Sequence, residues 1–334
     1  MDMVWSLKRS AAVVFVALIS MSSGCTTINF KEPVTSYASA MSQSATVFTD
    51  YYTQQNELAR RFYFTQIKYH KEKHIEFANQ NGVKTPLYFR YSPEGIKARL
   101  DAIRLIGAFG NKLAVMAGAD SPQRISDTSA GILASVSGLD QEFRKLTGVE
   151  ALHKDEFAQG SSQLVSAITK MYAEKIQQDA LKAAIQNGHA AVETILVALQ
   201  ADLKDLSFKN QGMFSTQLSD LAYLYNQGVD ARIAAQESKT PMKGPAAAQT
   251  SPQFTDTQLL DILGQAQATA ALYEGSVSQR PDEVIAAMRK ANDDLYEFSM
   301  HPKGDNALVA LNASLESFNA RIKPFVDYYV ANRK

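Results

Sequence analysis

Two histidines, His70 and His74, have the spacing of metal ligands on a helix. Residues four apart lie on one helix face, so both imidazoles can point toward the same ion. A zinc site uses three or four protein ligands, and no third ligand follows here at the next turn. The intervening Lys71, Glu72 and Lys73 indicate a solvated surface. We therefore predict no metal and no cofactor. His70 and His74 are the only candidate metal ligands that we identify in the sequence.

The usual sequence signatures of hydrolases are missing from this chain. It contains no Gly-x-Ser-x-Gly, no His-Glu-x-x-His and no Gly-rich phosphate-binding loop. Adjacent acids occur at Asp155-Glu156 and Asp293-Asp294. Neighbouring residues on a helix diverge by about 100°, so these pairs do not converge on one substrate. We interpret them as solvated or capping residues and assign no catalytic residue.

A basic and aromatic block extends from Arg60 to Arg104. It contains ten basic and four acidic residues, a net charge of plus six. Residues 254–300 have the opposite character, with eight acidic and three basic residues and a net charge of minus five. The first block suits contact with an anionic or sugar-bearing surface. In the alternative interpretation its rings belong to the core and the two blocks face each other within one bundle.

Tyr88, Phe89, Arg90 and Tyr91 lie inside the basic block, in a short connector flanked by prolines. Tyr and Arg are favoured at binding hot spots, because they combine a large contact area with a strong polar end. We predict that these four residues contact the partner. The alternative is that the rings cap the bundle core, in which case their role is packing.

The composition is that of an ordinary folded protein. The chain has 334 residues, 34 basic and 34 acidic residues, and 46% apolar residues. Seventeen Gly and ten Pro are few for a protein of many short strands, and long stretches rich in Ala, Gln, Leu and Ser favour helices. We predict an all-α protein.

The N-terminus has the three parts of a secretory signal. Lys8 and Arg9 precede an uncharged run of nine residues from Ala11 to Ile19, and a small-residue segment follows at 20–24. A membrane-spanning helix needs about 20 apolar residues, so this run is too short to span. The sequence predicts an exported protein.

The segment Ser22-Ser23-Gly24-Cys25 resembles the lipobox of bacterial lipoproteins, in which small residues precede an acylated cysteine. That class usually has an aliphatic residue at the position of Ser22, and ordinary signal cleavage is the alternative. The resemblance implies lipidation of Cys25, the single cysteine of the chain, and a membrane partner through the lipid. Because Thr26 rather than Asp follows, the resemblance also implies the outer membrane, on its periplasmic side.

Helix boundaries follow from Pro, Gly and capping residues. No Pro or Gly interrupts residues 34–80, which predicts one long N-terminal helix that ends at Gly82. Ser92-Pro93 predicts the start of a helix that runs to about Gly118. Further helices are expected from Ser121-Pro122 onward and at about 150–187, 189–207, 212–237, 255–278, 282–300 and 305–332, with Gly148, Gly188 and Gly212 as breaks.

Apolar residues three and four apart indicate two buried helix faces. One consists of Val192, Ile195, Leu199, Leu203 and Leu206. The other is a seam typical of coiled coils, with Pro324 as an expected kink, and consists of Leu308, Leu311, Leu315, Phe318, Ile322, Phe325 and Tyr329.

The chain is expected to have five parts: a signal peptide at 1–24, a short tether at 25–33, a helical bundle at 34–237, a Pro/Ala-rich flexible loop at 238–253, and a C-terminal three-helix segment at 254–334 that docks on the bundle. The predicted fold is an elongated helical bundle with coiled-coil-like packing.

The predicted role is a binding or interaction module of the cell envelope, whose partner is an envelope protein or a cell-wall component. A helical enzyme acting on cell-wall material and an inhibitor or immunity-type lipoprotein are the alternatives. Nucleic acid is not an expected partner, because the protein is predicted to be exported and has no net positive charge.

Overall fold

The computed structural model describes residues 30–69, 78–80, 83–85, 91–118, 138–146, 151–173, 178–237, 254–278 and 280–331. This part of the chain is mainly helical, which confirms the predicted all-α class. The helices are α1 (Lys31–Tyr69), α2 (Pro93–Met116), α4 (Leu139–Lys145), α5 (Lys154–Ala173), α6 (Gln178–Glu237), α7 (Asp256–Ser278), α8 (Pro281–Met300) and α9 (Asp305–Ala331).

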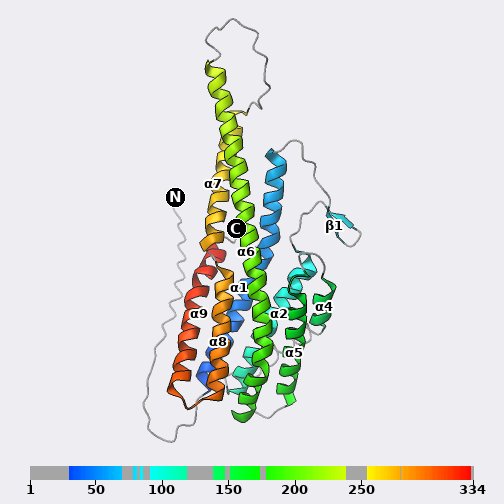
Figure 1. Ribbon diagram of the computed structural model, residues 1–334, viewed down its shortest axis with the longest axis vertical. Coiled ribbons are helices and arrows are strands. Elements are labelled where there is room, and N and C mark those ends of the chain that lie inside the picture. Colours follow the sequence, from blue (N-terminus) through cyan, green and yellow to red (C-terminus); the bar gives the residue numbers. More distant parts are fainter. Residues whose placement is uncertain are drawn as a thin grey trace, which may run out of the picture.

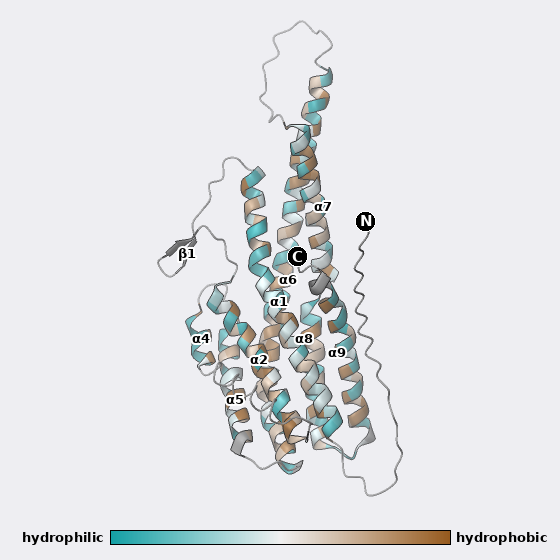
Figure 2. Ribbon diagram, turned by 180° about the vertical axis from the view of Figure 1, so that it is seen from behind, coloured by the Kyte–Doolittle hydropathy of each residue, from teal (hydrophilic) through white to brown (hydrophobic). Residues whose placement is uncertain are grey.

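The helices form a bundle with a narrower arm at one end (Figure 1). The bundle contains α2, α4, α5, α8, α9 and the first parts of α1 and α6, and the arm contains α7 beside the second part of α6. The C-terminal end of α1 extends toward the arm. Hydrophilic and hydrophobic residues alternate along each helix (Figure 2), as expected for helices with one face turned inward.

Both predicted apolar faces lie largely in the core. On α6, every residue of the predicted face is buried, from Val192 to Leu206. On α9, the seam is buried from Leu311 to Phe325, whereas Leu308 is 37% exposed, so the prediction was wrong for that residue. No packing is described for Tyr329.

The start of α2 has the predicted cap. Ser92 is the N-cap residue and its Oγ accepts a hydrogen bond from the backbone N–H of Gly95 at 2.9 Å, while Pro93 occupies the first turn. The helix ends before Gly118, whose φ of +82° is the left-handed conformation that glycine adopts without strain. Both ends of α2 therefore follow from local sequence.

The long N-terminal helix ends earlier than predicted. α1 ends at Tyr69, and residues 78–80 (β1) pair antiparallel with residues 83–85 (β2), with Gln80 opposite Val83. The two residues between these strands are Asn-Gly in the sequence, the pair most favoured in two-residue hairpin loops. The predicted helix end at Gly82 was wrong, because Asn81-Gly82 also fits a two-residue hairpin loop.

Two of the predicted glycine breaks are wrong, because α6 is one helix of 60 residues that passes through Gly188 and Gly212. At Gly188 the missing side chain allows close packing: a Cβ there would lie 2.2 Å from Cζ of Phe109. At Gly212 a Cβ would meet no atom within 4 Å. The helix expected at 150–187 is also divided, into α5 and the start of α6, which pack against each other.

The two glycines are expected to respond oppositely to alanine. Gly188→Ala should lower the free energy of unfolding by about 1–3 kcal/mol, because the buried Phe109 ring must move. Gly212→Ala should raise it by about 0.5–1 kcal/mol, because alanine has the higher helix propensity and meets open space. Urea unfolding of both variants measures the difference, and equal effects would contradict this account of α6.

Candidate functional site

Most of the predicted site residues lie outside the described part of the chain. These are Cys25, His70, His74, Tyr88, Phe89 and Arg90, together with the loop at 238–253. Within the described residues, no group of three His, Cys, Asp or Glu side chains could hold a metal ion.

Tyr91 is described, and it is a core residue. Only 6% of it is exposed, its backbone N–H donates to Oδ1 of Asn56, and its carbonyl accepts from Nδ2 of the same side chain. The guanidinium of Arg99 lies 4.5 Å from the centre of its ring. Tyr91 therefore follows the packing alternative and is not exposed to a partner.

Arg99 belongs to a buried ion pair between α2 and α6. Its Nε and Nη2 donate to the two carboxylate oxygens of Asp202 at 2.9 Å each, and Nη1 donates to the carbonyl of Gly95. Tyr52 of α1 donates its hydroxyl to the same Asp202 at 2.8 Å. Burial opposes the charge of Arg99, but the Asp202 carboxylate keeps the pKa of Arg99 above its ordinary value. These contacts join three helices inside the core, so we assign them a structural role.

The two charge blocks meet at one described point. Nζ of Lys68, near the end of α1, lies 2.6 Å from Oδ2 of Asp261 on α7. Lys97 instead pairs with Asp101 and Glu142, within or near its own block. The interpretation that the blocks face each other therefore holds for Lys68 and fails for Lys97.

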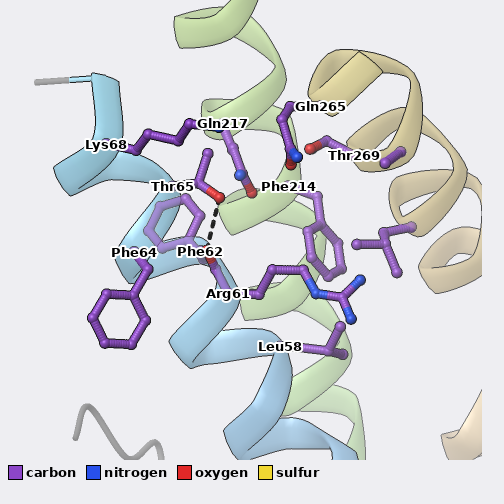
Figure 3. Close-up of a pocket in the computed structure, with 12 residues that line it drawn as sticks. Leu58, Arg61, Phe62, Phe64, Thr65, Lys68, Phe214, Gln217, Gln265 and Thr269 are labelled. Atoms are coloured by element: carbon purple, nitrogen blue, oxygen red, sulfur yellow. Dashed lines mark hydrogen bonds between the residues drawn. The ribbon is translucent and has the colours of Figure 1, made fainter. Parts of the chain in front are cut away.

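A groove lies between the C-terminal half of α1 and the α6–α7 pair (Figure 3). We call it the arm groove, and its volume is about 400 Å³. A second cavity of about 370 Å³ lies between α1 and residues 212–216 of α6, and Phe62 lines both cavities. The arm groove is lined by Leu58, Arg61, Phe62, Phe64, Thr65 and Lys68 of α1, Phe214 and Gln217 of α6, and Gln265, Ala268, Thr269 and Leu272 of α7.

Along the groove, the facing sides of the three helices mix polar with apolar residues. Leu58, Thr65 and Lys68 share one face of α1. Gln265 and Thr269, four residues apart, share one face of α7. Along α6, the main hydrophobic core extends as far as Leu206, before the groove. Beyond the groove lies a separate cluster, formed by Leu221, Leu224, Leu259 and Ile262. The layer between these two clusters mixes rings with polar side chains and lines the groove.

The end of α1 is attached to α7 beyond the groove. Lys68 and the hydroxyl of Tyr69 both donate to Oδ2 of Asp261, at 2.6 and 2.5 Å. The hydrogen bond from Lys68, followed by the one from Tyr69, holds the pKa of Asp261 below its usual value. Burial and the same carboxylate raise the pKa of Tyr69.

Acid is expected to release the end of α1. Because the pKa of Asp261 is lower in the folded protein than in the unfolded chain, its stabilising contribution is present above about pH 4, the usual value for Asp, and is lost as the pH falls further. Asp261→Asn should release the end at neutral pH. Hydrogen exchange of residues 58–69 measures this, and Asp220→Asn on α6 is the control. Unchanged protection in Asp261→Asn would contradict the attachment.

Two polar residues of the groove are largely buried, but their polar atoms are open to the groove and have no partner within the described ranges. Gln217 is 5% exposed and Thr269 is 3% exposed, and neither side chain makes a hydrogen bond to another residue of the described ranges. Gln265, which is half-buried, also has none within these ranges. In Figure 3 these three side chains extend into the space between the helices, whereas Thr65 is bonded to the carbonyl of Arg61 on its own helix.

The groove therefore offers aromatic rings, amide and hydroxyl groups, and two cations. Arg61 and Lys68 are the charged residues of the lining, and no carboxylate or histidine is among the described lining residues. Buried groups that can donate and accept hydrogen bonds give orientation, and the rings give contact area. The arrangement suits binding of a ligand, and we assign it no acid–base chemistry.

The arm groove was not predicted from the sequence. Its signal was available on α1, where Leu58, Thr65 and Lys68 occupy one helix face and mix apolar with polar residues. Which helices face that side of α1 follows only from the fold.

None of the helices in the described ranges is both long and apolar enough to cross a membrane. A comparison of the sequence and structure with protein-family models, curated proteins and solved structures found no match.

Proposed function

We propose that this protein is a binding or interaction module of the bacterial cell envelope, held by a lipid on Cys25 at the periplasmic face of the outer membrane. The resemblance of residues 22–25 to a lipobox, after a basic and then apolar N-terminus, supports the location. The arm groove supports the role. In this proposal the groove, rather than the connector at 88–91, holds the partner.

The main support is the pair of polar side chains, Gln217 and Thr269, whose polar atoms open into the groove. A ligand that displaces water from an amide or hydroxyl loses affinity unless it replaces the hydrogen bonds of that water. Gln217 and Thr269 therefore favour a groove filled by groups that hydrogen-bond to them. A site that served only packing would have apolar residues at these two positions.

The finer architecture that we propose is an elongated bundle in which the long α1 and the α9 seam pack in the manner of a coiled coil. The buried spacing of Leu311, Leu315, Phe318, Ile322 and Phe325 supports this packing for α9. α1 extends over 39 residues from the base of the bundle to the arm.

The enzyme and inhibitor alternatives rank below the binding module. An enzyme acting on cell-wall material by acid–base chemistry needs convergent acids at its site. The arm groove contributes none from its described lining residues. An inhibitor or immunity-type lipoprotein would also bind a protein partner, and it differs from the first proposal in what the partner does.

Fractionation tests the location. Cys25→Ala should move the protein from the membrane fraction to the soluble fraction, or leave the precursor uncleaved, because no other cysteine is present to accept a lipid. Ser23→Ala, which keeps a small residue before Cys25, is the matched control. Normal processing and unchanged membrane retention of Cys25→Ala would contradict the lipid attachment.

Co-purification tests the role of the groove. Gln217→Leu and Thr269→Val replace the two polar groups that open into the groove by side chains of similar size. Partners captured by the wild-type protein should be lost, while the melting temperature stays the same or rises. Gln236→Leu, at the exposed end of α6, is the matched control and should capture the same partners. Equal capture by all three variants and the wild type would overturn the proposed role of the groove.

A further inference from the structure

We infer that the ligand of the arm groove is a peptide segment of a partner protein that combines apolar side chains with acidic ones. This inference rests on the proposed function and names the chemistry of its partner. It follows from three properties of the lining residues: amide groups without partners, aromatic and aliphatic surface, and cations without acids among the lining residues.

The amide groups favour a peptide backbone over a lipid chain. A Gln side chain has the same donor and acceptor as a peptide group, so Gln217 and Gln265 can each bond to one N–H and one C=O of a bound segment. Thr269 adds a hydroxyl that donates or accepts. An acyl chain would displace water from the polar atoms of Gln217 and Thr269 without replacing its hydrogen bonds.

The remaining surface favours apolar side chains on that segment. Phe62, Phe64 and Phe214 provide three rings without a hydroxyl group, and Leu58 and Leu272 lie beside them. Leucine, valine or phenylalanine side chains of a peptide would cover these groups. A sugar could stack on a ring, but its hydroxyl groups would gain nothing from the two leucines.

The charges favour acidic residues on the segment. Arg61 and Lys68 are seven residues apart, two turns along the same face of α1, and both line the groove. Arg61 pairs with Glu57 and Lys68 pairs with Asp261, and both acids lie outside the lining. The Arg61 and Glu57 side chains are 3.4 Å apart and are 54% and 61% exposed. An ion pair that is this exposed contributes little to stability. The Arg61 guanidinium can therefore exchange Glu57 for a carboxylate of a ligand.

Selection from random peptides tests the ligand class directly. The mature protein is immobilised, and a phage-displayed library of random peptides, each about twelve residues long, is selected on it with the Gln217→Leu/Thr269→Val protein as a counter-selection. The enriched peptides are synthesised with a fluorophore and titrated by polarisation. We expect sequences with apolar residues and at least one Asp or Glu, which bind the double variant about tenfold more weakly or worse.

A charge variant tests the cation separately. Arg61→Gln should weaken the enriched peptides several-fold and reduce the sensitivity of their binding to salt, because a charge pair at the rim is lost. Lys204→Gln, an exposed cation on the bundle part of α6, is the control and should leave the affinity unchanged. Equal affinity of Arg61→Gln and the wild-type protein would remove the acidic part of the inference.

The other outcomes separate this inference from the proposed function. Enriched peptides that are basic or purely apolar but lose affinity in the double variant would overturn the ligand class and leave the groove as a binding site. In another outcome, the library gives no groove-dependent peptide while an envelope protein or a wall fragment is still captured through the groove. That result would overturn the peptide class and leave the proposed function standing. If no peptide and no captured partner depends on the groove, both proposals are overturned.

Discussion

Asp202→Ala is expected to lower the free energy of unfolding by about 3–5 kcal/mol, because it leaves the Arg99 guanidinium unpaired in the core. Both side chains of the pair are at most 2% exposed, so water cannot replace the lost carboxylate. The hydroxyl of Tyr52 loses its acceptor in the same variant. Urea unfolding followed by circular dichroism measures the effect.

Two comparisons isolate the buried charge as the cause. Asp205→Ala, three residues along α6, removes an exposed carboxylate that pairs with Lys209, and it should cost less than about 1 kcal/mol. Replacing Tyr52, Arg99 and Asp202 together by Phe, Met and Leu should recover most of the loss, because no charge then remains unpaired. Equal effects of Asp202→Ala and Asp205→Ala would show that the buried pair is not a special feature of the core.

Leu315→Ala is expected to cost about 2–5 kcal/mol, the range found for buried leucines that leave a cavity. Leu315 is 5% exposed on the α9 seam and belongs to the main core. Leu308→Ala on the same helix is the matched control and should cost less than about 1 kcal/mol, because Leu308 is 37% exposed and lies outside the main core. Thermal and urea unfolding of the two variants measure the contrast, and similar losses would mean that the two positions are equally buried.

Elements that follow from local patterns were predicted well from the sequence. The cap at Ser92, the end of α2 close to Gly118 and the helices on either side of Arg280-Pro281 depend on residues that are neighbours in the chain. The three-four spacing of Val192 to Leu206 predicted a buried face because a helix has a fixed period.

Features that depend on distant residues were not predicted. Whether Gly188 interrupts a helix or permits close packing depends on Phe109, which belongs to another helix. Tyr91 is buried because Arg99 and Asn56 bind it from α2 and α1. The arm groove needs three helices to be placed side by side before Gln217 is seen to lie near Thr269. Local chemistry fixes the elements, and only their pairing decides which polar residues converge.

The unbroken length of α6 makes the molecule a rigid spacer. Sixty residues at a rise of 1.5 Å per residue give a rod of about 90 Å, and the same rod belongs to both the bundle and the arm. No loop lies between the two parts of this helix, so the arm groove cannot swing toward the base of the bundle without bending a continuous helix. A partner held in the groove would therefore be kept at a set distance from the base, and a pull on that partner would be transmitted along α6 into the packing around Gly188 and Phe109.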